Sequence, residues 1–155
     1  MSKSLKRVRR ALEEAGIAYE MRAADESTRT ARQAADALGC EIDQIAKSIV
    51  LRSGDGIVLF VTAGGRQVDM ERAEALAGTR LERADAALVR ARTGFAIGGV
   101  SPIGLVEPPV AFWDVTLDRF KTVWAAAGTP HHVFGAAPGD VKRLAGARTA
   151  EFSGM

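Results

Sequence analysis

Two periodic patterns of apolar and polar residues, one helical and one strand-like, follow one another at the start of the chain. Apolar side chains recur every three or four positions over residues 4–15, which predicts an amphipathic helix ending at Gly16. Residues 17–22 then alternate between apolar and polar side chains, as a half-buried strand does. Thr30 has the hydroxyl of a helix N-cap, so the next helix is predicted over residues 31–38.

The strongest strand signal lies in two apolar, β-branched runs at residues 48–52 and 57–62. The four residues between them, Ser-Gly-Asp-Gly, are typical of a turn, so the two runs predict a hairpin of mostly buried strands. Asp43 is predicted to cap a short turn that leads into the first strand.

The second half of the chain consists of short elements separated by glycine and proline. Asp69 and Asp85 are predicted N-caps of helices over residues 70–77 and 86–92. Further elements are predicted as strands at 110–113, 121–125 and 131–134, a last helix opening at Pro138, and a short strand in the tail from Thr149. This order predicts one α+β (mixed α/β) domain over residues 1–155, with a mixed, largely antiparallel sheet.

A glycine-rich segment, residues 93–104, interrupts this pattern with four glycines and one proline among apolar side chains. One interpretation is a tight connection between core strands. The other is a ligand-binding loop, in which the backbone N–H groups of Gly98, Gly99, Val100 and Ser101 are free to donate.

Composition narrows the class of protein without deciding between these interpretations. The chain has 155 residues, of which 47% are hydrophobic and 26% charged, as in an ordinary globular domain. The absence of a signal-peptide pattern and of a long apolar run, together with the single Cys40, predicts a cytoplasmic protein with no membrane partner. Net charge is only +2, but five basic residues fall within the first ten positions. That cluster is either the solvated face of a helix or a contact for phosphate.

Candidate reactive side chains are few. Lys47 precedes a buried strand, and it is either a surface lysine with a buried stem or a cation at the rim of a pocket. His131 and His132 are adjacent, so on a strand they point to opposite faces, and no metal site is predicted. Ser101 lacks the G-x-S-x-G context of a nucleophile, and no nucleotide-binding glycine pattern occurs. Backbone donors of the glycine loop assisted by Lys47 therefore remain as the predicted chemistry.

Three stretches, residues 43–50, 61–69 and 93–104, together resemble the YbaK/prolyl-tRNA synthetase-associated domain family in order and spacing. The resemblance extends over essentially the whole chain. Its most specific part is a lysine combined with a G-x-x-x-P motif, here Lys47 with Gly98 and Pro102. Members of this family are free-standing or synthetase-inserted aminoacyl-tRNA deacylases.

The resemblance implies a barrel-like mixed sheet surrounded by helices, and hydrolysis of the ester of a mischarged tRNA, with tRNA-Pro carrying a small wrong amino acid as the expected substrate. It implies catalysis by a bound water, a substrate hydroxyl or a substrate thiol, with no cofactor and no metal. The residues implied as catalytic are Lys47, Gly98 and Gly99, and those implied as substrate-binding are Thr30, Val100, Ser101, Pro102, Gly128 and His131. Expected partners are the acceptor end of aminoacyl-tRNA and prolyl-tRNA synthetase or another translation factor.

One departure from the family pattern bears on specificity. Ala126-Ala127-Gly128 stands where some cysteinyl-tRNA deacylases have a serine before glycines, which argues against cysteine as the substrate. Two alternatives of other classes remain: a tRNA- or synthetase-binding module without catalysis, and a small-molecule pocket protein unrelated to translation.

Overall fold

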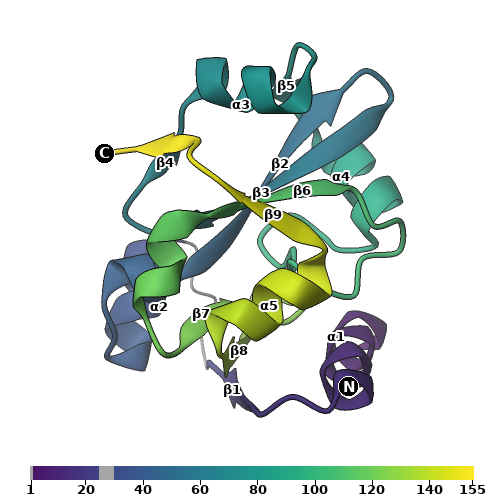
Figure 1. Cartoon of the computed structure of the whole chain (residues 1–155). Coiled ribbons are helices and arrows are strands. Elements are labelled where there is room, and N and C mark those ends of the chain that lie inside the picture. The colour runs from purple at the N-terminus through teal and green to yellow at the C-terminus, as the bar shows by residue number, and fades with distance from the viewer. Residues whose placement is uncertain (1, 25–29) are drawn as a thin grey trace.

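A computed structural model describes residues 2–24 and 30–155 of the chain (Figure 1). The helices are α1 (Lys3–Ala15), α2 (Ala31–Leu38), α3 (Met70–Ala77), α4 (Ala86–Thr93) and α5 (Pro138–Ala145), with short 3-10 helices η1 (Ile42–Gln44) and η2 (Val115–Arg119). The strands are β1 (Tyr19–Ala23), β2 (Ala46–Ser53), β3 (Gly56–Ala63), β4 (Gln67–Val68), β5 (Glu82–Arg83), β6 (Val110–Asp114), β7 (Val123–Ala126), β8 (His132–Ala136), β9 (Ala147–Ala150) and β10 (Ser153–Gly154).

The largest sheet has five strands in the order β5-β2-β3-β6-β9. β2 and β3 form the predicted antiparallel hairpin, whereas β3 pairs with β6, and β6 with β9, in parallel. A second, antiparallel sheet has the order β1-β8-β7, and β10 pairs with β4. The mixed α+β class is confirmed, but the expectation of a barrel-like sheet needs correction, because the strands form separate sheets that do not close.

Local sequence signals account for the predicted helices. Thr30 caps α2 by accepting the Gln33 N–H, and the Gln33 side chain accepts the N–H of Thr30 in return. Asp69 and Asp85 cap α3 and α4 in the predicted way. The predicted cap at Asp43 is wrong, because its carboxylate instead accepts the N–H of Gly65, 2.8 Å away.

Several boundaries differ from those predicted. β7 begins at Val123 rather than at residue 121, and β8 covers His132–Ala136 rather than residues 131–134. The two-residue strands β4 and β5 were not predicted, because strands this short have no recognisable alternation. The strand predicted in the tail from Thr149 is β9, which already begins at Ala147, and a second short strand, β10, follows it.

β2, whose residues line the candidate site, pairs with the core strand β3. β3 is buried throughout residues 58–63, and Phe60 stacks on Phe112 of β6 with ring centroids 5.4 Å apart. Asp114, 2% exposed, accepts hydrogen bonds from the Ala63 N–H and the Ser153 hydroxyl, which ties β3, β6 and β10 together. Within the described parts of the chain, no helix is both long and apolar enough to cross a membrane.

Candidate functional site

A gap along one edge of β2 contains the candidate site. β2 pairs with β5 only at Leu51 and Arg52, and Ile45, just before β2, forms an isolated bridge with Trp124. Between these contacts, Ala46–Val50 pair with β3 on one side and with no described strand on the other. A cavity of about 560 Å³ occupies this gap, and residues of β2, β5 and β7 line it. Its size lies within the usual range for small-ligand sites.

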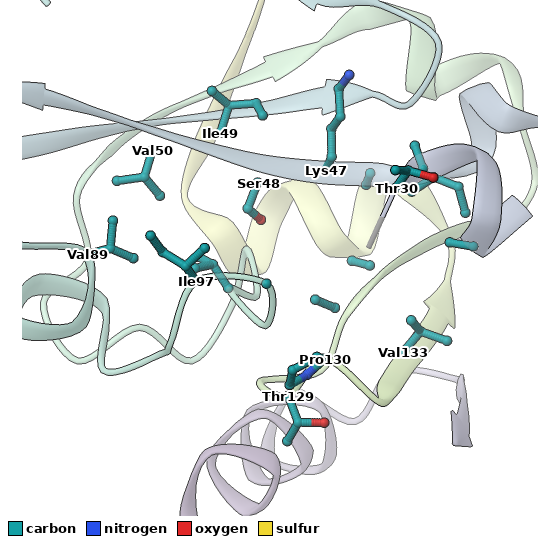
Figure 2. A pocket seen from close by; sticks show the side chains of 18 of the residues that line it. Thr30, Lys47, Ser48, Ile49, Val50, Val89, Ile97, Thr129, Pro130 and Val133 are labelled. Atoms are coloured by element: carbon teal, nitrogen blue, oxygen red, sulfur yellow. The ribbon is translucent and has the colours of Figure 1, made fainter. Parts of the chain in front are cut away.

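The cavity wall is mainly apolar. Figure 2 shows Val50, Val89, Ile97 and Val133 facing the space below β2, with Thr129 and Pro130 on the opposite side. Polar or charged side chains in the lining come from Thr30, Lys47, Ser48, Arg83, Thr129 and His132. An apolar cavity with a few polar groups suits a ligand that has a small side chain and a polar reacting group.

Lys47 lines the cavity from β2, but its side chain extends to the side of the strand opposite Ser48 and Val50 (Figure 2). Its amine donates to the Gly64 carbonyl oxygen at 3.2 Å. Burial lowers the pKa of the Lys47 amine below its ordinary value, and the carboxylates of Asp43 and Asp114 partly oppose that shift. Lys47 is thus a half-buried cation at the edge of the cavity rather than a freely solvated lysine.

The glycine loop forms a tight turn whose tip faces the cavity. The Gly99 N–H donates to the Ala96 carbonyl at 3.0 Å, which closes the turn, and Gly98 has a φ of +95°. A positive φ at the third residue, with no positive φ at Ile97, defines a type II turn, which requires glycine at Gly98. The predicted free donor at Gly99 is therefore wrong, because its N–H is used within the turn.

Two other loop amides are available. Gly98 and Val100 line the cavity, and neither N–H has an acceptor among the described residues. Gly99 does not line the cavity; a Cβ placed on it would lie 2.8 Å from the backbone of Thr129. The glycine loop and the segment at Thr129 are therefore in close contact, and together they bound one side of the cavity.

The next two residues of the loop lie in the core. Ser101 is fully buried, and its hydroxyl accepts the Ile103 N–H at 3.3 Å. Pro102 is also buried, and neither residue lines the cavity. The structure thus separates Gly98 and Val100, which face the site, from Ser101 and Pro102, which anchor the loop.

The segment at residues 128–132 forms the opposite rim. Gly128, a predicted site residue, does not line the cavity; a Cβ on it would lie 2.8 Å from the Ser4 carbonyl oxygen, because α1 packs there. His131 is exposed and outside the lining, whereas His132 lines the cavity, with its Nδ1 2.7 Å from the Thr129 hydroxyl oxygen. Sequence reasoning missed His132, although its place two residues before buried Phe134 puts both on one strand face.

These groups define the chemistry that the cavity can support. Backbone N–H groups at Gly98 and Val100 can stabilise negative charge on a carbonyl oxygen. The imidazole of His132, oriented by Thr129, can accept a proton, and Lys47 adds positive charge. Among the described residues, no group of three or more His, Cys, Asp or Glu side chains could hold a metal ion.

Comparisons with known proteins show the family of the chain. The family model of the aminoacyl-tRNA editing domain matches residues 25–144. A Bacillus subtilis protein, the uncharacterized protein YwhH, is 38% identical over 104 residues, which cover 66% of this chain and 66% of that protein. The proline–tRNA ligase of Thermosipho africanus is 33% identical over 79 residues, half of this chain but only 14% of the ligase.

A solved structure named "putative trans-editing enzyme for prolyl tRNA synthetase" superimposes with a TM-score of 0.92 at 40% identity. The superposition covers 100% of this chain and 99% of that one. The family resemblance inferred from the lysine and the glycine loop is therefore confirmed.

Proposed function

Because the chain belongs to the aminoacyl-tRNA editing domain family, we propose that it is a trans-acting deacylase that hydrolyses the ester of a mischarged tRNA. The proposed substrate is tRNA-Pro carrying a small wrong amino acid, since two relatives are proline–tRNA ligases and a similar structure is named for prolyl-tRNA editing. The observation that carries the proposal is the cavity lined by Gly98 and Val100, whose amides have no acceptor among the described residues.

The proposed reaction begins with a water attacking the carbonyl carbon of the aminoacyl ester. His132 accepts a proton from that water, and the substrate's own ribose hydroxyl helps to orient it. The amides of Gly98 and Val100 donate to the oxyanion of the tetrahedral intermediate. When the ester C–O bond breaks, the ribose oxygen takes up the proton, and the products are a free amino acid and deacylated tRNA.

Lys47 has a binding role in this proposal. Its half-buried amine donates to the Gly64 carbonyl at 3.2 Å, and the residue lines the cavity at its edge. There it contributes positive charge for the terminal phosphate of the tRNA 3′ end. Because burial lowers the pKa of this amine, anionic substrate is expected to strengthen its protonation.

The apolar lining favours a small neutral side chain on the amino acid. Ile45, Val89 and Val133 offer no partner for a charged group, which would enter the cavity at a high desolvation cost. Binding alone separates side chains that differ by one methylene only about 10- to 200-fold, so a second, hydrolytic selection step improves accuracy. The proposal places the protein in the cytoplasm, beside prolyl-tRNA synthetase, where charged tRNA is made.

The direct test is a panel of tRNA-Pro molecules charged with alanine, serine, threonine, cysteine or proline. Release of at least one wrong amino acid well above the buffer rate, with Pro-tRNA spared, supports the proposal. Lys47→Ala should slow that release while leaving circular dichroism and Tm close to those of the wild type. Binding of tRNA with no release of any amino acid would replace the proposal with the non-catalytic binding module.

A further inference from the structure

Three of the five basic residues at the start of the chain form one stripe on α1. Lys3, Lys6 and Arg10 are exposed and spaced three and four residues apart, so they lie on the same face of the helix. At 1.5 Å per residue, the stripe extends over about 10 Å of helix. The opposite face of α1, with Leu5, is buried in the core. We call Lys3, Lys6 and Arg10 the basic stripe.

The basic stripe begins beside the rim of the cavity. The Ser4 carbonyl oxygen lies so close to Gly128 that a Cβ there would be only 2.8 Å away. Gly128 is followed directly by Thr129 and Pro130, which line the cavity. Figure 2 shows α1, in purple, directly below these two residues. A ligand extending out of the cavity over this rim therefore meets the first turns of α1.

The charged side chains of α1 are placed so that they oppose the helix dipole. Cations are unfavourable near the positive N-terminal end of the helix dipole, by about 0.3–1 kcal/mol each at the surface. α1 has no acidic residue in its first turn and no basic residue in its last. By contrast, α5 has Asp140 in its first turn and Lys142 and Arg143 in its last. The stripe thus lowers the stability of α1, which indicates a role in binding.

The stripe is also free to bind. Among the described residues, neither Lys3 nor Lys6 has an ion-pair partner, and Arg10 has only Glu14 at 4.0 Å. The acids of α1 lie at its far end, where Glu13 accepts a hydrogen bond from Tyr19. The end of the helix beside the cavity is therefore uniformly positive.

We infer that the basic stripe binds the phosphate backbone of the duplex next to the tRNA 3′ end. This inference rests on the proposed function, because the cavity can hold only the terminal aminoacyl nucleotide. RNA duplexes are recognised largely through shape and phosphates, and lysine and arginine supply that contact without reading sequence. The stripe makes affinity for whole tRNA depend on salt, while a short aminoacyl ester does not reach it.

The test uses the double variant Lys3→Gln/Lys6→Gln, which removes the two unpaired cations and keeps good helix-forming residues. The matched control, Arg72→Gln/Arg80→Gln, removes two exposed cations, one in α3 and one just beyond its end, and neither residue lines the cavity. Each protein is titrated with uncharged tRNA-Pro transcript at several salt concentrations. Each is also assayed on the 3′-aminoacyl ester of adenosine, which has no duplex.

For Lys3→Gln/Lys6→Gln, the slope of log affinity against log salt should fall by about 2, roughly one per phosphate contact. The control should keep the wild-type slope, and hydrolysis of the adenosine ester should be unchanged in both. Equal slopes in the wild type and the α1 variant would overturn the inference, even if the enzyme deacylates tRNA normally. Failure of the wild type to hydrolyse any ester would instead refute the proposed function. The salt dependence of tRNA binding would still show whether the basic stripe contacts phosphates.

Discussion

Replacement of Gly98 by alanine tests whether the turn of the glycine loop serves catalysis or only connects α4 to β6. Gly98 has a φ of +95°, and a Cβ there would meet no atom within 4 Å, so the cost comes from the backbone alone. A left-handed conformation costs an L-residue about 1–2 kcal/mol. In a protein of this size that corresponds to a fall in Tm of roughly 2–8 °C. Relief of the strain by rotation of the turn would redirect the amides of Gly98 and Val100.

Gly78 offers a matched control for this substitution. It ends α3 with a φ of +73°, also has open space around its Cβ position, and lies outside the cavity lining. Gly78→Ala should therefore lose similar stability, measured by thermal and urea unfolding. Only Gly98→Ala should also lose kcat/KM in deacylation, by about 100-fold, the usual effect of removing one oxyanion donor. If both variants deacylate within twofold of the wild type, the loop amides do not take part in the reaction.

Three further predictions concern single side chains of the cavity. The free energy of unfolding of Lys47→Met at pH 7 should equal or exceed that of the wild type, because burial of the Lys47 ammonium destabilises the folded wild type. The lowered pKa means that the folded wild type loses this proton at a lower pH than the unfolded chain does. The difference between variant and wild type should therefore shrink as the pH rises toward about 10.4. Urea titrations at pH 7 and pH 10 measure this, and a strongly destabilised variant at pH 7 would contradict it. His132→Gln should slow deacylation at least tenfold at unchanged Tm, whereas His131→Gln should have no effect; equal rates for the two variants would remove His132 from the reaction. Ser48→Ala should raise the free energy of unfolding by about 1 kcal/mol, because the buried Ser48 hydroxyl has no partner among the described residues; a lower Tm would contradict this.

The helices could be predicted from the sequence because their signals are local. The N-cap side chains of Thr30, Asp69 and Asp85 bond to backbone groups two or three residues ahead. Such bonds depend on residue type and spacing alone, so they can be predicted without knowledge of the fold. The β2–β3 hairpin could be predicted for the same reason, since a four-residue turn joins its strands.

The rest depends on contacts between distant segments. Asp43 has the chemistry of a helix cap, yet the N–H that it accepts belongs to Gly65, 22 residues away. The parallel pairing of Val58 with Val110 brings together segments whose own residues fit either strand direction equally well. Which of the adjacent residues His131 and His132 lines the cavity is likewise set by packing against distant segments, because the two have the same side chain.

The gap beside β2 has a consequence for association between copies of the chain. An unpaired strand with the apolar run Ile49-Val50-Leu51 is the kind of edge on which proteins aggregate through added strands. Here β5 at one end and the Ile45–Trp124 bridge at the other confine the free edge to the five residues Ala46–Val50. An incoming strand longer than these five residues would collide with β5 or with the bridge, whereas a single nucleotide with its amino acid is shorter than the gap. The opening proposed for the substrate is therefore too short for a longer strand of a neighbouring molecule.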